Sequence, residues 1–262
     1  YEGWEENTGV GPAPFHQIVT GALSGSWWSG SLNDDGVPGA PQRLGSPRGF
    51  YQLAFDGADY QESYKSFTHD PSEQFHVSFN SPRYREWAQK LVDYVNVYGG
   101  TRSEVIPPVS LNDMGDVNML TRADLEGQTW AVVNVWNGSR EDTVMLQIND
   151  GAAFEATRTQ KGTGEAKLRS IEASDPFAIF RQFSDTRRAM ASASGNNGYE
   201  MFQGSIWEGN AGPLDSWLWT NSSPHLWTVD LPADLPAGIH SLTVKVEDHH
   251  GRTYSDTIAF EV

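Results

Sequence analysis

The clearest structural pattern in this chain is IHSLTVKVEDHHGRTYSDTIAFEV, residues 239–262. The apolar residues Leu242, Val244 and Val246 alternate with polar ones, and the alternation resumes after Gly251. Successive side chains of a strand point to opposite faces of a sheet, so this period of two indicates strands that are buried on one face. A glycine between two such runs suits a tight turn. The stretch therefore predicts a half-buried antiparallel hairpin.

A second pair of strand patterns lies earlier in the chain. Residues 130–136, WAVVNVW, are β-branched and aromatic, and residues 144–148 alternate after the turn Asn137-Gly138, which we interpret as another hairpin. Strands at short intervals without βαβ alternation predict an immunoglobulin-like β-sandwich over residues 128–262. Within it, residues 160–220 are rich in Gly, Ser and Asn, and we expect a long loop or irregular insertion there.

The first half has a different character. Residues 82–98 predict one helix, because Ser81 can cap it, Pro82 suits its first position and its aromatic and aliphatic residues recur at helical spacing. Thr121 and Asp124 have the spacing of a capping box for a second, short helical turn. Short strands are expected around the helix, at residues 15–20, 50–55, 60–67 and 75–79. The fold class is therefore mainly β, with a small α+β domain at 1–127 followed by the sandwich.

Composition excludes several classes of function. The chain has 34 acidic and 18 basic residues, a formal net charge of −16, which repels nucleic acid and anionic headgroups. No stretch approaches the roughly 20 apolar residues that a membrane-spanning helix requires. With no cysteine, the chain has neither a disulfide scaffold nor a thiolate metal site. Because it begins at Tyr1, we expect a processed or excised piece.

Two groups of short motifs resemble one known family. The first group is SGSWW at 24–28, DGVP at 35–38, GSPRGF at 45–50 and FDG at 55–57. The second is SPHLW at 223–227, LPAGIH at 235–240 and FEV at 260–262. In content and order they are similar to the region that follows the catalytic domain of bacterial calcineurin-like phosphoesterases. The similarity covers residues 15–80 and 128–262, with Leu44 where the family has Asp and Phe50 where it has Tyr.

The resemblance implies a partner domain, and it implies that the catalytic metal centre lies in that domain and not in this chain. The partner is an N-terminal metallophosphatase domain of the same polypeptide, which would hold a dinuclear metal (Mn, Fe or Zn) in a secreted or periplasmic bacterial protein. Such metals polarise a phosphoester and activate water. Of the family's metal motifs, Asp248-His249-His250 spells only Asp-x-His, and we interpret it as a chance match in an exposed turn. We therefore expect no catalytic residue, metal or cofactor in this chain.

Five residues are candidates for a cleft or an interface with the metallophosphatase domain, namely His16, Trp27, Trp28, Tyr51 and Tyr64. In the intact protein, His16 could approach the metals as a proton donor or phosphate contact. Adjacent tryptophans on a strand point to opposite faces, so one of Trp27 and Trp28 is expected in the core and the other at an interface. The expected role is accessory, shaping the access of a small-molecule phosphoester to the active site.

The rival function is sugar binding by an aromatic platform. Its candidate residues are Trp217, Trp219, His225 and Trp227. Exposed aromatic faces can stack on sugar rings, so this alternative is a carbohydrate-binding module, beside which stands a general interaction domain of a secreted protein. Trp217-Leu218-Trp219 alternates as a strand does, which favours packing of both indoles in the sandwich core.

Overall fold

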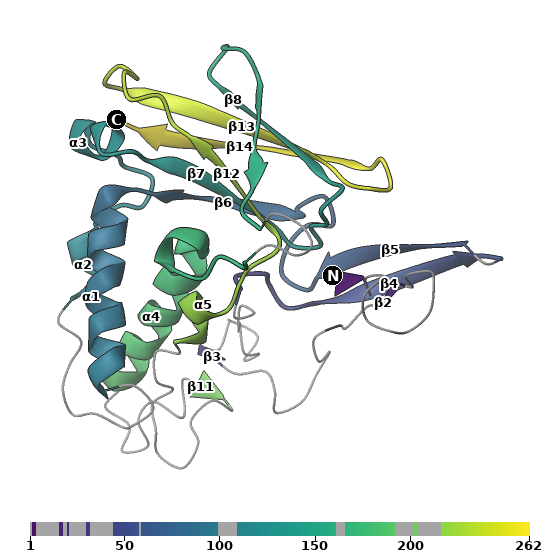
Figure 1. Cartoon of the computed structure of the whole chain (residues 1–262), viewed down its shortest axis with the longest axis horizontal. Helices are drawn as coiled ribbons and strands as arrows, with labels where there is room; N and C mark the ends of the chain where they lie inside the picture. Colours follow the sequence, from purple (N-terminus) through teal and green to yellow (C-terminus); the bar gives the residue numbers. More distant parts are fainter. Residues whose placement is uncertain are drawn as a thin grey trace.

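The computed structural model describes residues 44–57, 59–98, 109–160, 166–191 and 216–262, together with short backbone segments near residues 2, 16, 20, 30 and 202. Two antiparallel sheets pack face to face, and a layer of helices lies against one of them (Figure 1). The prediction of a mainly β protein is confirmed, and the arrangement of the sheets is a β-sandwich. Among the helices that the structure describes, none combines the length and the apolar character that a membrane span requires.

Each sheet of the sandwich has four strands. The first has the order β10-β12-β7-β6, with β10 (Thr157–Arg158), β12 (Leu226–Asp230), β7 (Trp130–Val135) and β6 (Phe75–Asn80). The second has the order β14-β13-β8-β9, with β14 (Thr253–Glu261), β13 (Ile239–Glu247), β8 (Thr143–Ile148) and β9 (Phe154–Glu155). The predicted hairpin at the C-terminal end is confirmed as β13–β14.

Two sequence-based expectations about the sandwich differ from the structure. Strands β7 and β8 do not form a hairpin, because β7 pairs with β6 and β12 while β8 pairs with β13 and β9 in the opposite sheet. The connection between them crosses the sandwich, and both apolar faces then meet in one core. Strand β6 lies before residue 127, so the sandwich also draws a strand from the first half of the chain.

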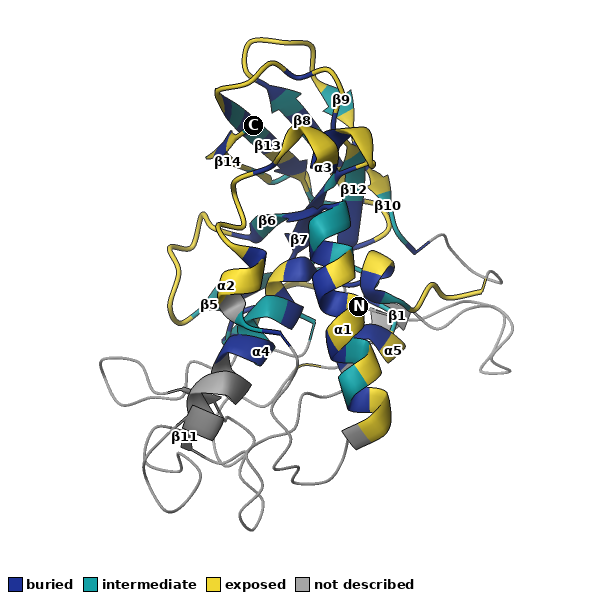
Figure 2. Ribbon diagram, turned by 90° about the vertical axis from the view of Figure 1, so that its left-hand side faces the viewer, coloured by how far each residue is buried: buried dark blue, intermediate teal, exposed yellow. Residues whose placement is uncertain are grey.

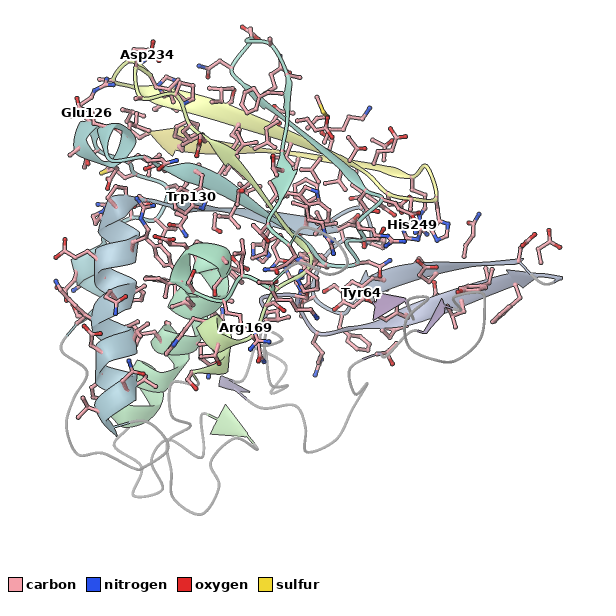
Figure 3. The ribbon with its side chains drawn as sticks, viewed as in Figure 1. Tyr64, Glu126, Trp130, Arg169, Asp234 and His249 are labelled. Atoms are coloured by element: carbon pink, nitrogen blue, oxygen red, sulfur yellow. The ribbon has the colours of Figure 1, made fainter. Side chains whose placement is uncertain are left out.

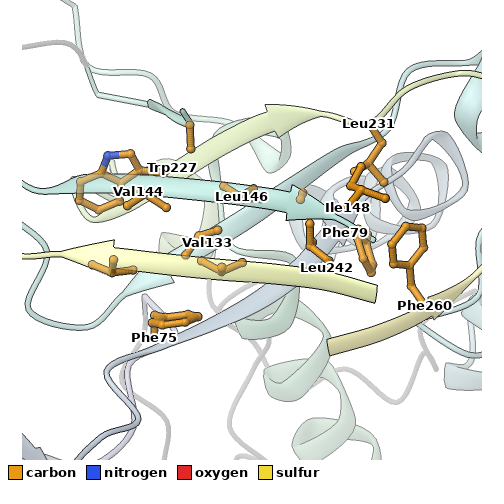
Figure 4. Packing of buried hydrophobic residues seen from close by; sticks show 14 of the residues in the cluster. Phe75, Phe79, Val133, Val144, Leu146, Ile148, Trp227, Leu231, Leu242 and Phe260 are labelled. Atoms are coloured by element: carbon orange, nitrogen blue, oxygen red, sulfur yellow. The ribbon is translucent and has the colours of Figure 1, made fainter. Parts of the chain in front are cut away.

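The core lies between the two sheets. Alternate residues of β7 and β8, including Val133 and Leu146, point into it and are almost fully buried. Leu242 of β13 and Phe260 of β14 lie beside Leu146 on the second sheet, and Trp227 of β12 on the first sheet closes one end (Figure 4). In β8 and β13 the period of two in the sequence is therefore the period of burial, whereas β7 is buried on both faces.

Most of the helices form a second apolar cluster on the outer face of the first sheet. They are α1 (Pro82–Tyr98), α2 (Leu111–Met114), the 3-10 turn η2 (Ile171–Ala173), α4 (Pro176–Ala191) and α5 (Trp217–Thr220). The short helix α3 (Arg122–Glu126) instead contributes Leu125 to the core between the sheets. Helix α1 is confirmed, with the Tyr84 amide donating to Ser81 Oγ at its start, and Figure 2 shows buried and exposed patches along it. The capping box of Thr121 and Asp124 also forms.

Part of the predicted insertion is helical. The expectation of a loop is wrong over α4, which begins where Asp175 accepts a hydrogen bond from the Phe177 amide and Pro176 takes the first helical position. Apolar residues such as Ile179 and Phe183 then pack at helical spacing in the second cluster. The strand expected at Trp217-Leu218-Trp219 is likewise wrong, because these residues lie in α5.

A two-stranded hairpin projects beside the sandwich. It consists of β4 (Gly49–Asp56) and β5 (Asp59–Ser66), which confirms the strands expected near residues 50–55 and 60–67. It lies next to the turn between β13 and β14 and belongs to neither four-stranded sheet (Figure 1). Short pairs β1 (Glu2–Gly3) with β2 (His16–Gln17), and β3 (Gly30–Ser31) with β11 (Phe202–Gln203), complete the described strands.

Candidate functional site

One face of the β4–β5 hairpin is aromatic and apolar around a single carboxylate. Residues directly opposite one another in an antiparallel pair share a face. The register therefore places on this face the pairs Tyr51 with Tyr64, Leu53 with Glu62, and Phe55 with Tyr60. We call these six residues the aromatic hairpin face. Leu53 is 46% exposed and Phe55 is 70% exposed, so its outer half is open to solvent.

Glu62 is the buried centre of this face. Its side chain is 1% exposed and contacts two imidazoles of the β13–β14 turn. His249 Nε2 lies 2.7 Å from Glu62 Oε1, and His250 Nε2 lies 3.0 Å from Glu62 Oε2. Figure 3 shows His249 at the end of the β13–β14 hairpin, next to the β4–β5 hairpin that carries Tyr64. The cluster therefore joins two segments that are 187 residues apart in the sequence.

A second carboxylate orients His249 from the other side. Asp142 Oδ1 lies 3.2 Å from His249 Nδ1 and also accepts the His249 backbone amide at 3.0 Å. Asp142 Oδ2 accepts the Ser139 amide, so the carboxylate itself is fixed by the connection between β7 and β8. Arg252 donates to the Glu62 carbonyl oxygen at 2.8 Å and to Asp248 at 2.6 Å, which ties the turn to the hairpin.

The charges of this cluster influence its neighbours. Burial opposes ionisation of Glu62, but the hydrogen bond from His250 and the charges of both imidazoles outweigh it and lower its pKa. Burial raises the pKa of Tyr51 to about 12, and the negative charge of Glu62 adds to that effect. Tyr51 is therefore a neutral phenol at physiological pH, and Glu62 is a carboxylate.

The interpretation of His249 and His250 as an exposed turn is wrong. Their side chains are only 9% and 16% exposed, because the β4–β5 hairpin covers them. The adjacent histidines were visible in the sequence as a possible pair of ligands. Nothing local, however, predicts that Glu62 and Asp142 meet them, since both contacts arise from the packing of distant segments.

A second polar cluster lies between the first sheet and helix α4. Asp175, fully buried, accepts hydrogen bonds from Asn134 Nδ2 at 2.7 Å and from Ser78 Oγ at 3.2 Å. His76 Nε2 lies 2.6 Å from the same carboxylate, and the Trp136 indole donates to His76 Nδ1 at 3.2 Å. Because His76 Nδ1 accepts the indole N–H, the hydrogen on Nε2 is the one that His76 donates to Asp175. Burial opposes the ionisation of Asp175, but His76 and the other donors lower its pKa.

His225 extends this network. Its Nδ1 lies 2.7 Å from Asn134 Oδ1, and the amide nitrogen of Asn134 is already committed to Asp175 and to the Leu44 carbonyl oxygen. His225 must therefore donate from Nδ1, which leaves Nε2 without a proton in the neutral ring. Burial disfavours the charged ring and lowers the pKa of His225 from 6.5 to about 4. The cluster fastens α4 to the sheet, and we assign it a structural role.

The residues predicted for a cleft or interface are only partly described. Tyr51 and Tyr64 lie together on the aromatic hairpin face, with ring centroids 5.3 Å apart. Tyr64 is buried, donates from its hydroxyl to the Pro47 carbonyl oxygen and serves to anchor the hairpin. His16 lies in β2, with no side chain described, and Trp27 and Trp28 fall outside the described residues.

The aromatic platform does not form from the tryptophans whose side chains are described. Trp219 packs in the helical cluster and Trp227 in the sandwich core, so neither offers an open ring face. The indole of Trp219 is therefore buried, but in the helical cluster and not in the sandwich core where it was expected. His225 is engaged with Asn134, and the side chain of Trp217 is not described.

Comparison with known proteins identifies the family. Residues 17–196 match the family described as the C terminal of calcineurin-like phosphoesterase. The chain belongs to this family. The family implies a companion N-terminal phosphoesterase domain in the same polypeptide. No curated protein and no solved structure matches the chain significantly. Strands β12, β13 and β14 lie beyond the matched residues, yet they complete both sheets of the sandwich.

Proposed function

We propose that this C-terminal region is an accessory to the companion phosphoesterase domain, which it contacts through the aromatic hairpin face and whose substrate access it shapes. The observation that carries the proposal is the β4–β5 hairpin, which pairs with no other described strand. An isolated two-stranded hairpin is marginally stable in water, and its inner end is covered here while its outer end is not. Leu53 and Phe55 at that outer end supply apolar area suited to an interface.

Two further features support a non-catalytic role. The described residues do not fit a dinuclear metal centre, because they bring together a single group of three potential ligands. The dinuclear metal therefore belongs, in this proposal, to the companion domain. At the covered end of the hairpin, Tyr51 stays a neutral phenol, which suits packing and hydrogen bonding rather than proton transfer at neutral pH.

The first test compares hydrogen exchange in this chain alone and in the intact polypeptide. The amides of residues 49–66 should exchange more slowly in the intact polypeptide, because the companion domain covers them. Equal exchange in both would overturn the proposed interface. Hydrolysis of an aryl phosphate with added Mn²⁺ should occur only in the intact polypeptide, and turnover by this chain alone would overturn the accessory role.

A matched pair of variants tests the surface itself. Phe55→Ser should restore fast exchange at residues 49–66 in the intact polypeptide and alter KM for a bulky phosphoester. Ile239→Ser is the control, because Ile239 is 79% exposed on strand β13 and does not belong to the β4–β5 hairpin. If both variants behave alike, the aromatic hairpin face has no special role.

A further inference from the structure

We propose that Glu62, His249 and His250 form a binding site for a divalent transition-metal ion of the zinc class. One ligand atom from each residue lies within 4.8 Å of the other two. Two imidazoles and one carboxylate are a donor set that Zn²⁺ and its first-row neighbours bind with three protein ligands and an open position. The site lies at the inner end of the hairpin, where Glu62 is buried.

The geometry requires little rearrangement. Both Nε2 atoms point at the same carboxylate, one toward each oxygen, at 2.7 Å and 3.0 Å. Ligand atoms bound tetrahedrally to Zn²⁺ at roughly 2.0–2.2 Å lie about 3.4 Å apart. A cation would thus take the place of the hydrogens that now bridge these atoms, with shifts that side-chain rotation can supply.

Asp142 supplies the outer support that metal-binding histidines usually have. A ligating imidazole generally donates its other N–H to a carboxylate or a carbonyl, which fixes the ring and its tautomer. Asp142 Oδ1 lies 3.2 Å from His249 Nδ1 and accepts its hydrogen, so Nε2, which now donates to Glu62, is the atom that a cation would bind after displacing that hydrogen. The Ser139 and His249 amides hold Asp142 in place, so the orientation of His249 is built into the sandwich.

A simple ion pair accounts for less of this arrangement. One histidine would satisfy the charge of Glu62, yet a second imidazole is aimed at its other oxygen, with ring centroids 4.0 Å apart. Both rings extend from one turn toward the two oxygens of one carboxylate, an arrangement in which a single cation can bind all three side chains. The sequence led us to expect no metal in this chain, but that expectation leaves unexplained why both imidazoles converge on the Glu62 carboxylate.

The bound ion would join the hairpin to the sandwich. Glu62 lies in β5, and the histidines lie in the turn after β13, so the cation would cross-link segments 187 residues apart. Metal binding would therefore hold the aromatic hairpin face in one orientation. The site itself stands independently of the companion domain, because all three ligands belong to this chain.

Calorimetric titration of the metal-free chain with ZnCl₂, after dialysis against EDTA, tests the proposal. We expect one equivalent of Zn²⁺ to bind, and Glu62→Gln and His250→Gln each to weaken binding at least tenfold. Glu155→Gln and His69→Gln are matched controls that remove an exposed carboxylate and an exposed imidazole elsewhere. Absence of binding, or equal binding by the ligand variants, would overturn the site, as would equal weakening by the controls.

A spectroscopic experiment keeps the proposal falsifiable if a ligand variant folds poorly. Co²⁺ added to the unmodified chain should produce the visible absorption of a four- or five-coordinate ion, and Zn²⁺ should abolish it by displacement. Asp142→Asn keeps all three ligands, so it should retain the absorption but bind roughly 10- to 100-fold more weakly. A spectrum like that of hexaaqua Co²⁺ would overturn the site even if the companion-domain interface were confirmed.

Discussion

Mild acid should destabilise this protein through His225. Burial lowers the pKa of this imidazole from 6.5 to about 4, so the folded state favours the neutral ring. The charges of His76 and Arg158 act in the same direction, whereas the nearby Asp175 carboxylate opposes them. Protonation would also place a second N–H on a ring whose Nδ1 hydrogen is already donated to Asn134.

The sign and size of the effect follow from linkage. The unfolded chain takes up a proton near pH 6.5 and the folded chain only near pH 4, so the contribution of His225 is complete above 6.5 and declines as the pH falls toward 4. Between about pH 7.5 and about pH 5, this one group should cost about 2 kcal/mol of the free energy of unfolding. Below the folded pKa both states are protonated, and no further loss comes from this residue.

Urea unfolding followed by tryptophan fluorescence at the two pH values measures the loss. The His225→Gln variant should lose about 2 kcal/mol less than the unmodified chain over the same interval, whatever its stability at neutral pH. His240→Gln is the control, because it removes a buried imidazole outside this network. If His225→Gln shows the same loss as the unmodified chain, the buried neutral imidazole is refuted as the cause.

The remaining predictions concern stability and use the same urea assay at neutral pH. Gly45→Ala should cost about 1–3 kcal/mol, because Gly45 has φ +96° and an added Cβ would overlap the Asp175 carboxylate; a neutral effect would contradict that close approach. Leu242→Ala should cost about 2–5 kcal/mol, because Leu242 is fully buried between the sheets; a loss under about 1 kcal/mol would contradict the sandwich core. Thr121→Ala should cost about 1 kcal/mol, because its hydroxyl accepts the Asp124 amide at the start of α3; an unchanged midpoint would contradict the cap.

Predictions from local pattern succeeded where the physical cause is local. The alternation in residues 239–262 predicted β13 and β14, and helical spacing after a serine cap and a proline predicted α1. The spacing of Thr121 and Asp124 predicted their capping box. In each case the interacting groups lie within a few residues of one another, so the order of residues is sufficient.

Errors arose where composition was taken as a substitute for packing. The Gly- and Ser-rich character of residues 160–220 hid helix α4, although Asp175 and Pro176 formed a recognisable start signal. The alternation of Trp217 and Trp219 resembled a strand because so short a run does not distinguish the two periods. Strands β7 and β8 were expected to pair, but β7 pairs with β6 and β12, and β8 pairs with β13 and β9.

The amino-acid order alone was enough for the mainly β class, the principal helix, the terminal hairpin and the family. It did not reveal that Glu62 and Asp142 converge on His249, or that Asn134 links Asp175 to His225. Secondary structure depends on neighbours that recur at a fixed period, whereas these clusters join residues that are 41 to 187 positions apart. Such contacts exist only after burial of the two apolar cores has set the positions of the sheets, the helices and the hairpin.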